Sequence, residues 1–199
     1  MKKTLLWLSV LGCVVLLMTE YTPAKGISQE ELDPKYDQFT YVVEIDTVSV
    51  GVTTYVARYR EKEEYMPLEI GIANKTFDKL TLTRNSFILI DELGNEYSLI
   101  PVEELLKNYH KQEADLKIAH ITQISRSLFG GLTQVESNFQ PGRVSDKLVM
   151  DRVELPKWYY MIDMLYFQHP ATGIKGKKFE FRINAPELEQ PIQVRFRVD

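Results

Sequence analysis

The sequence predicts a mainly β fold, an antiparallel β-sandwich with a helical insertion at about 102–131. Several short segments alternate apolar and polar residues with the two-residue period of a half-buried strand, and turn-forming residues separate them. One stretch after Pro101 instead repeats its apolar residues at helical spacing. No internal repeat is visible, and residues 39–199 are long enough for one domain with a sizeable core.

The clearest strand signals lie between Leu68 and Pro101. The run at 87–90 is apolar on both faces, which is typical of a central strand. Residues 91–96 are rich in Asp, Asn and Gly and match no calcium-binding pattern, so they indicate a hairpin loop. Because strands close in sequence commonly pair, we expect an antiparallel meander here. Its predicted strands are 68–73, 80–83, 87–90 and 97–100.

The N-terminus predicts export. Met1–Lys3 is positively charged and precedes an apolar run of about 15 residues, so residues 1–24 are interpreted as a signal sequence or membrane anchor. Val10–Cys13 resembles a bacterial lipobox, which makes Cys13 a candidate lipidation site. Thr22–Ala24 offers an ordinary cleavage site instead, and retention of the uncleaved segment is the third alternative. Each places the remaining chain outside the cytoplasm, membrane-associated or secreted, in a bacterial cell envelope, with the membrane as one partner.

Cysteine usage and charge exclude several classes of protein. Cys13 is the only cysteine, so the exported part forms no internal disulfide and holds no cysteine-based zinc site. The whole chain has a net charge of −4, and residues 1–24 carry +1, which leaves −5 on the remainder. Nucleic acid requires clustered Lys and Arg, so we expect no nucleic-acid partner.

The segment between the leader and the organised strands is interpreted as a tether followed by two strands. Residues 25–38 are polar and predict a tether. Residues 39–50 and 52–59 predict strands that turn at Gly51, with the Val, Thr and Tyr content that suits a pleated surface. The charged run at 60–64 is expected to be a solvated loop rather than a docking patch.

After Pro101 the pattern becomes helical. Val102, Leu105 and Tyr109 recur at helical spacing, and Gly130–Gly131 ends the segment. An insertion of this length is either a cap over one sheet face or a functional lid. We favour the cap, because the apolar stripe needs burial.

The C-terminal third predicts more strands and one unusual aromatic run. A strand is expected at 147–153, ended by Pro156, and residues 158–167 are apolar on both alternate faces. Residues 179–183 and 192–198 alternate clearly and predict half-exposed strands.

The aromatic run has two interpretations. The helical insertion covers its outer face, or that face is a recognition surface, since Trp and Tyr are common interface anchors. We favour the covered face. On the second interpretation, Trp158, Tyr160 and Tyr166 are the candidate partner or ligand contacts.

Three blocks of residues carry a family resemblance: Leu68–Lys75, Phe87–Asp91 with Gly94 and Tyr97, and Pro141–Gly142 before Leu148–Val149. Across about 39–185 they resemble the telokin-like, immunoglobulin-fold family of secreted or lipid-anchored bacterial proteins of unknown function. The resemblance implies an extracytoplasmic, immunoglobulin-like sandwich and no activity. The insertion and the aromatic run depart from the family pattern.

The sequence offers no catalytic signature. The three histidines are His110, His120 and His169, and the first two are ten residues apart, so they share no helix face. No zinc-protease, P-loop, nucleophile-elbow or dinucleotide motif occurs. We therefore predict no enzyme and assign no catalytic, cofactor-binding or metal-binding residue.

Two function classes remain. The first is a non-enzymatic envelope protein that binds or scaffolds another protein, or a peptide added as a strand at a sheet edge. The second is a small-ligand carrier with a pocket between the helical insertion and the aromatic strand. A closed apolar cavity beneath the insertion favours the carrier, whereas a filled core with an exposed aromatic patch favours the binder.

Overall fold

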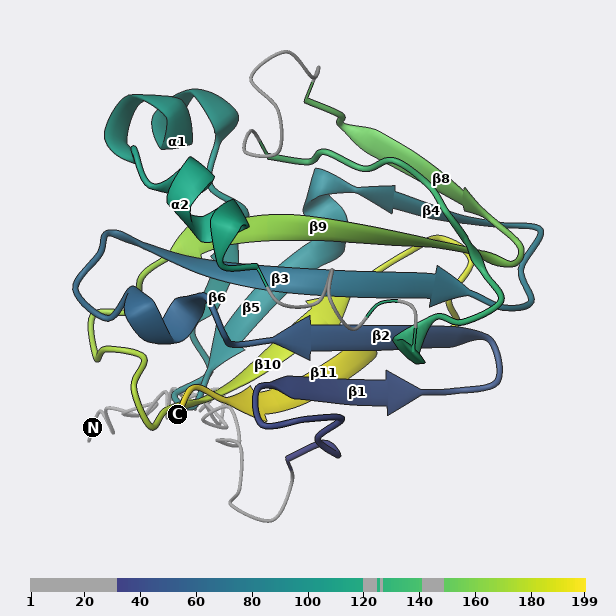
Figure 1. Cartoon of the computed structure of the whole chain (residues 1–199), viewed down its shortest axis with the longest axis horizontal. Helices are drawn as coiled ribbons and strands as arrows, with labels where there is room; N and C mark the ends of the chain where they lie inside the picture. The colour runs from purple at the N-terminus through teal and green to yellow at the C-terminus, as the bar shows by residue number, and fades with distance from the viewer. Residues whose placement is uncertain (1–31, 120–124, 126, 141–148) are drawn as a thin grey trace, which may run out of the picture.

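The computed structural model describes residues 32–119, 125, 127–140 and 149–199, and it confirms a mainly β fold (Figure 1). The strands are β1 (Thr40–Glu44), β2 (Val48–Thr53), β3 (Tyr65–Asn74), β4 (Lys79–Thr83), β5 (Phe87–Asp91), β6 (Glu96–Ser98), β7 (Thr133–Gln134), β8 (Arg152–Pro156), β9 (Tyr159–Gln168), β10 (Lys178–Ile183) and β11 (Ile192–Arg197). The helices are the short 3-10 turns η1 (Ala57–Tyr59) and η2 (Arg84–Ser86), with α1 (Val102–Asn108) and α2 (Gln112–Lys117).

The strands form two larger sheets and one small one. The five-stranded sheet has the order β1-β2-β3-β9-β7, and the four-stranded sheet has the order β11-β10-β5-β6. Strands β4 and β8 form a separate two-stranded sheet. The paired strands are antiparallel except for β7 and β9.

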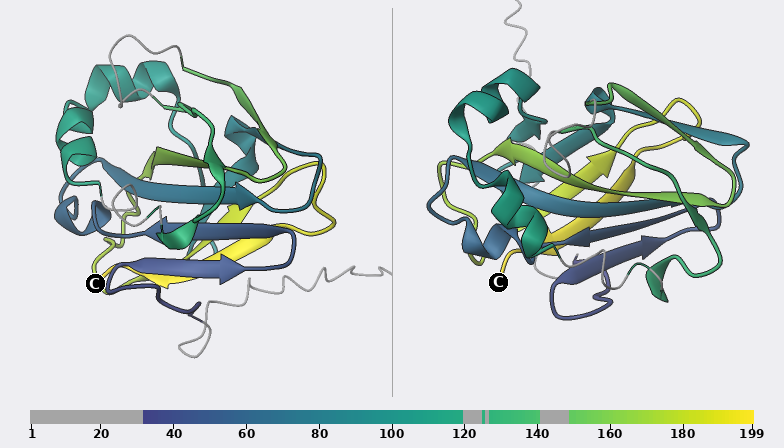
Figure 2. Two further views of the ribbon diagram at one scale, coloured as in Figure 1. Left: turned by 45° about the vertical axis from the view of Figure 1, so that its right-hand side comes forward. Right: turned by 45° about the horizontal axis from the view of Figure 1, so that its top comes forward.

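The two larger sheets face each other and enclose the main core (Figure 2). Strand β3 contributes every second side chain to this core, from Met66 to Ile72. Phe167 of the five-stranded sheet meets Phe181 of the four-stranded sheet edge to face, with ring centroids 6.3 Å apart. Burying such side chains supplies most of the driving force for folding, about 1.5–3 kcal/mol each. The predicted sandwich therefore rests on contact between residues far apart in sequence.

The predicted meander is wrong, because β3, β4 and β5 belong to three different sheets. Of the four strands in the predicted meander, only β5 and β6 pair with each other, as a local hairpin. The fully buried Asn74 redirects the chain after β3. Its side-chain amide donates to the carbonyls of Phe77 (2.8 Å) and Leu155 (2.9 Å), and its Oδ1 accepts from the N–H of Phe77 (3.0 Å). These bonds direct β4 toward β8 and away from β3.

Two predicted boundaries also shift. The turn between β1 and β2 lies at Ile45–Thr47 rather than at Gly51, which sits inside β2 opposite Val42 and Gly71. Every residue of β2 is buried, Gly51 included, and the strand pairs on both sides through Gly51, so the sheet, and not the glycine, decides where the strand ends. The strand expected at 147–153 begins instead at Arg152; residues 147 and 148 lie outside the described part of the chain.

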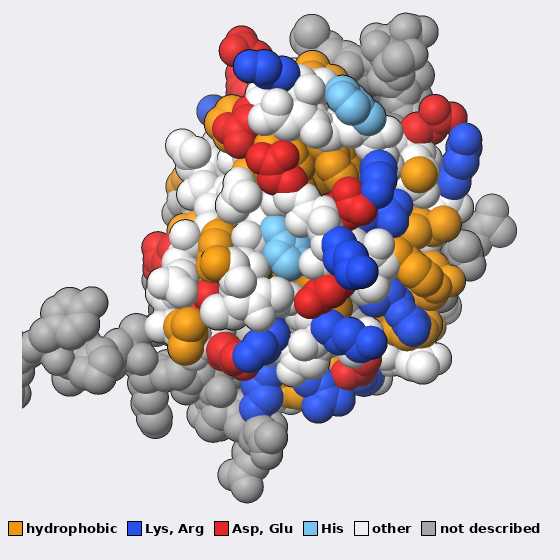
Figure 3. Space-filling model, turned by 90° about the vertical axis from the view of Figure 1, so that its left-hand side faces the viewer, with side chains coloured by type: hydrophobic (Ala, Val, Ile, Leu, Met, Phe, Trp, Pro, Cys, Tyr) orange, Lys and Arg blue, Asp and Glu red, His pale blue; other side chains and the backbone are white. Residues whose placement is uncertain are grey.

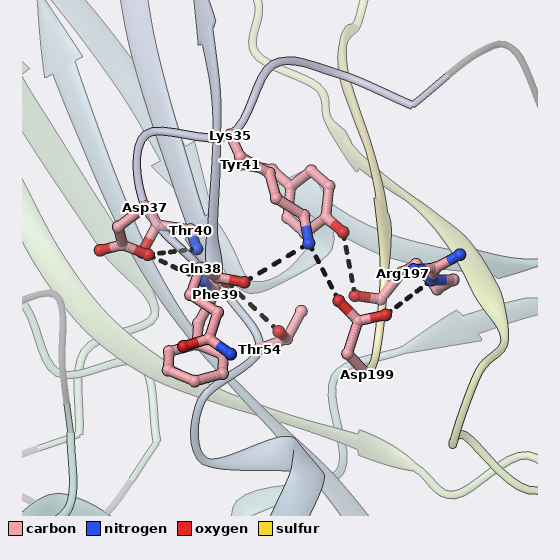
Figure 4. A network of polar contacts seen from close by, with 9 residues as sticks. All are labelled: Lys35, Asp37, Gln38, Phe39, Thr40, Tyr41, Thr54, Arg197 and Asp199. Carbon is pink, nitrogen blue, oxygen red and sulfur yellow. Dashed lines mark hydrogen bonds and ion pairs between the residues drawn. The ribbon is translucent and has the colours of Figure 1, made fainter.

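The described part of the predicted tether, residues 32–38, packs on the sandwich (Figure 4). Lys35 forms a β-bridge with Tyr41, and its Nζ pairs with Asp199 at 2.9 Å. The Asp37 Oδ1 accepts the N–H groups of Phe39 and Thr40, both at 2.8 Å. The folded region thus begins before Phe39, because these residues satisfy backbone groups at the edge of β1. Residues 1–24, including Cys13, lie outside the described residues, as do Pro141–Gly142 and Leu148.

The loop between β5 and β6 is a structural turn, as predicted. Asp91 accepts the N–H groups of Leu93 and Asn95 on Oδ1, and the Asn95 amide and the Tyr97 hydroxyl on Oδ2, all within 2.8–2.9 Å. Burial opposes ionisation of Asp91, but these four donors outweigh it and lower its pKa. Burial and the bond to Asp91 raise the pKa of Tyr97 to about 12.

No helix among the described residues has both the length and the apolar content needed to cross a membrane.

Replacing Asn74 should test how the chain changes sheets. We expect Asn74→Ala to lower the free energy of unfolding by about 2 kcal/mol, because buried backbone groups lose their partners. Urea denaturation measures the change. Asn85→Ala, the same replacement at an exposed position in η2, should change stability by less than about 0.5 kcal/mol. Equal effects for the two variants would contradict this role of Asn74.

Replacing Asp91 should remove one source of acid sensitivity. A carboxyl whose pKa is lowered by folding adds stability above its unfolded pKa, near 3.8, and loses it as the pH falls through the folded value. Wild type should therefore exceed Asp91→Asn in stability at neutral pH, and the difference should shrink below about pH 4. Urea unfolding over a pH series measures this, and parallel profiles would disprove it.

Candidate binding surfaces

The three predicted contact residues lie in different settings. Trp158 is 56% exposed, Tyr160 is 8% exposed and Tyr166 is fully buried. Tyr160 and Tyr166 lie on the side of β9 opposite the main core, as the alternation predicts, whereas Trp158 lies in the turn before β9. Only Trp158 presents its ring to solvent, so it alone offers a large contact area in this conformation.

The helical insertion covers the outer face of β9, as we favoured. Beneath α1 and α2, the ring of Tyr109 meets Tyr65 at 5.7 Å and Tyr166 at 5.4 Å between centroids. Leu105 and Met164 belong to the same cluster. Further along β9, Phe129 stacks on Tyr160 at 4.9 Å. Aromatic side chains therefore fill the space that the carrier interpretation assigns to a ligand.

A buried charged network holds the insertion in place. Asp115 of α2 is fully buried. Its carboxylate accepts from Arg60 Nε at 2.7 Å, from the Tyr109 hydroxyl at 2.6 Å and from the Tyr166 hydroxyl at 3.3 Å. The bonds join Arg60 in the loop after η1, the C-terminal end of α1, helix α2 and the central strand β9. Satisfied in this way, the carboxylate can remain ionised away from water.

Burial shifts the pKa values in this network. It raises the pKa of Asp115, while the bonds from Tyr109 and Arg60 oppose that shift. It also raises the pKa of the Tyr109 hydroxyl, which the neighbouring Asp115 raises further. The phenols therefore stay protonated and act as donors throughout the neutral range.

The charged run at 60–64 is a loop, as predicted, with Lys62 and Glu64 exposed, but its other three side chains are half-buried and have partners. Arg60 reaches Asp115, and Glu61 Oε2 accepts the N–H groups of Ile174 (3.1 Å) and Lys175 (2.9 Å). Glu63 pairs with Lys111. These partners come from distant parts of the chain, so local composition carries no signal for them.

Trp158 occupies a conformation that is costly for its residue type. It has φ of +68°, and no other non-glycine residue in the described chain has positive φ. Its N–H donates to the Asn74 carbonyl at 2.8 Å, and its carbonyl accepts from Thr133 at 3.1 Å. Left-handed backbone costs a residue with a Cβ about 1–2 kcal/mol. Two backbone hydrogen bonds thus hold Trp158 in this conformation at a turn, while its indole ring faces water.

A second aromatic surface lies at the opposite end of β3. Phe39, Tyr55 and Tyr59 form a chain of ring contacts with centroids 4.9 and 5.6 Å apart. The Arg58 guanidinium lies 4.6 Å from the Phe39 ring centroid and 5.5 Å from that of Tyr59. Tyr59 is 51% exposed. Neither the composition nor the charge pattern identifies this surface, because Phe39 and residues 55–59 meet only in the fold.

Other features offer weaker sites. A shallow groove of about 470 Å³ lies between residues 33–36 and Val42–Glu44. His110 is exposed, His169 is half-buried, and His120 lies outside the described residues. Among the residues that the structure describes, no group of three His, Cys, Asp or Glu side chains is placed to hold a metal ion.

Removing Asp115 should loosen the insertion. We expect Asp115→Ala to lower the free energy of unfolding by about 3 kcal/mol, because Arg60, 12% exposed at its side chain, loses its counter-ion. The double variant Asp115→Ala with Arg60→Met should recover part of the lost free energy of unfolding, since it leaves no buried charge without a counter-ion. Urea denaturation measures both, with hydrogen exchange across 102–119 to locate the change. A single variant as stable as wild type would overturn this assignment.

Comparison with known proteins adds little to this geometry. No protein-family model matches the chain, and no curated protein matches it. Among solved structures, the chain is similar to the crystal structure of a "putative lipoprotein (ycdA)" from Bacillus subtilis, with 12% identity and a TM-score of 0.42. The match covers 78% of this chain and 38% of that one, so the chain spans well under half of that protein. A TM-score this low carries no argument about function or family.

Proposed function

We propose that this protein is an extracytoplasmic β-sandwich, membrane-anchored or secreted, that binds another envelope protein or peptide without catalysing a reaction. The observation that carries the proposal is the exposed indole of Trp158, held in left-handed backbone. Strain of this kind gathers at functional sites. The leader predicted at 1–24 and the telokin-like resemblance are parts of the same proposal.

Binding energy supports Trp158 as the contact residue. Trp is the residue type most enriched among interface hot spots, because its ring buries a large area at small entropic cost. A glycine at 158 would relieve the backbone, yet the chain places its largest side chain there. Lys157 lies beside it, with Nζ 5.8 Å from the ring centroid. Such a pair suits a partner that offers an apolar pocket with an acidic rim.

Strand addition is the less favoured mode of binding. Residues 33–36 already bond to β1, and Asp33 exchanges bonds with Arg195 of β11 (2.9 and 2.6 Å). On β4, the Thr81 N–H donates to Glu187 Oε2 at 2.9 Å. Described edges of all three sheets are thus partly occupied by the chain itself. A partner that binds the Trp158 surface needs no unpaired strand at a sheet edge.

The carrier alternative has less support. It requires a cavity between the insertion and β9, whereas Tyr65, Tyr109 and Tyr166 contact one another there. A ligand could enter only if α1 and α2 moved away and the Asp115 network broke.

Two substitutions at Trp158 should separate binding from stability. Trp158→Ala and Trp158→Gly should both abolish capture of the partner in pull-downs from envelope extracts, because each removes the indole. Trp158→Gly should nevertheless be about 1 kcal/mol more stable than Trp158→Ala, since glycine tolerates positive φ.

Leu93→Ala serves as the matched control, because Leu93 is an apolar side chain 63% exposed in the β5–β6 turn. It should keep the partner. Capture that survives in both Trp158 variants would refute the proposed contact, whatever their stabilities.

A further inference from the structure

We propose that the domain docks through one end onto an anionic phospholipid surface, with Trp158 held at the opposite end. The docking end consists of Phe39, Tyr55, Arg58, Tyr59, Lys62 and Lys175, here called the basic aromatic end. The inference rests on the membrane attachment in the proposed function and adds an orientation to it.

The aromatic part of this end suits the headgroup region of a bilayer. Tyr59 is 51% exposed, and it lies against Tyr55 and Arg58. Tyrosine rings concentrate at membrane interfaces, because the ring is apolar and the hydroxyl needs water. Arg58 lies over two rings, so its guanidinium faces the same region as the phenols.

The basic part of this end consists of Lys and Arg side chains that have no acidic partner of their own among the described residues. Figure 3 shows Lys and Arg side chains gathered toward one side of this end, beside a hydrophobic patch and with acidic groups between them. Within the described residues, no ion pair involves Arg58, Lys62 or Lys175. Glu64 remains exposed and opposes them.

Several nearby acids are already engaged. Glu61 accepts two backbone N–H groups, and Glu63 pairs with Lys111. Asp199 binds both Lys35 (2.9 Å) and Arg197 (2.7 Å). Among the described residues, Arg58, Lys62 and Lys175 are therefore three cations without an ion pair at this end, against the two carboxylates of Glu61 and Glu64, although the chain as a whole is acidic at −4. Anionic lipid attracts basic residues that lie near the surface.

Tether length places the membrane within reach. Only residues 25–31 separate the predicted leader from Leu32, and seven residues span at most about 25 Å. A domain of this size has a radius of gyration of about 15 Å, so an anchored chain keeps part of its surface near the bilayer. Attachment also makes a weak contact effective, because docking becomes intramolecular.

The sandwich separates the two surfaces. Tyr65 at the start of β3 follows the loop that carries Arg58 and Lys62, whereas Asn74 at its end bonds to Trp158. Ten strand residues extend about 30 Å. Docking through the basic aromatic end therefore points the turn between β8 and β9, which carries Trp158, away from the membrane and toward a partner; in Figure 1 this turn and η1 lie at opposite ends of β3.

Lysine footprinting on vesicles tests the orientation. The full chain is reconstituted into phosphatidylcholine vesicles with and without phosphatidylglycerol, and a membrane-impermeant reagent acylates exposed lysines, which mass spectrometry quantifies. We expect acylation of Lys62 and Lys175 to fall several-fold on the anionic vesicles. Lys157, exposed beside Trp158, should react equally on both and serves as the internal control.

Exposed-residue variants sharpen the test. Arg58→Gln combined with Tyr59→Ser should restore acylation of Lys62 and Lys175 while the chain still floats with the vesicles. Lys157→Gln should leave the protection intact.

Each failure is distinguishable. A chain that floats with the vesicles but shows equal acylation on both lipids overturns the docking and leaves the attachment standing. Equal protection on uncharged vesicles overturns the anionic recognition. A chain that stays in solution overturns the attachment, and the docking with it.

Discussion

The fold depends on burying both faces of the central strand pair, β3 and β9. Every residue of β3 is buried, and so are eight of the ten residues of β9. A sheet buried on both faces needs two covers, because an exposed apolar face has no compensation from water. The four-stranded sheet covers one face, and the segment after Pro101 covers the other. The rest of the structure follows from supplying these two covers.

The second cover explains the buried charges. Helices α1 and α2 have only seven and six residues, too short to be stable alone, so they need tertiary contacts. Tyr109 and Leu105 supply the apolar contact. Asp115 sets the orientation of the helices, because its carboxylate meets both Arg60 and Tyr166 only in this arrangement. The network thus fixes which face the helices cover.

The same arrangement gives the molecule two distinct ends. Because β3 and β9 run the length of the sandwich, the loops at their ends collect residues from distant parts of the sequence. One end gathers Phe39, Tyr55 and Arg58, and the other presents Trp158. On our proposals, the first faces lipid and the second faces a partner, so a rigid sheet sets the spacing between attachment and recognition.

The sequence alone determined the class of fold and which side chains of its strands face the main core, but not that β3 is buried on both faces. The period-two alternation of residues such as Ile70 and Phe181, the helical spacing after Pro101 and the Asp91 turn are local properties, which the neighbouring residues dictate. Only the tertiary structure decided which strands pair, where residues 32–38 lie and which of Trp158, Tyr160 and Tyr166 meets water. Pairing and burial depend on partners such as Asn74 with Leu155, or Arg60 with Asp115, that lie far apart in the chain, and single-sequence patterns carry no record of such contacts.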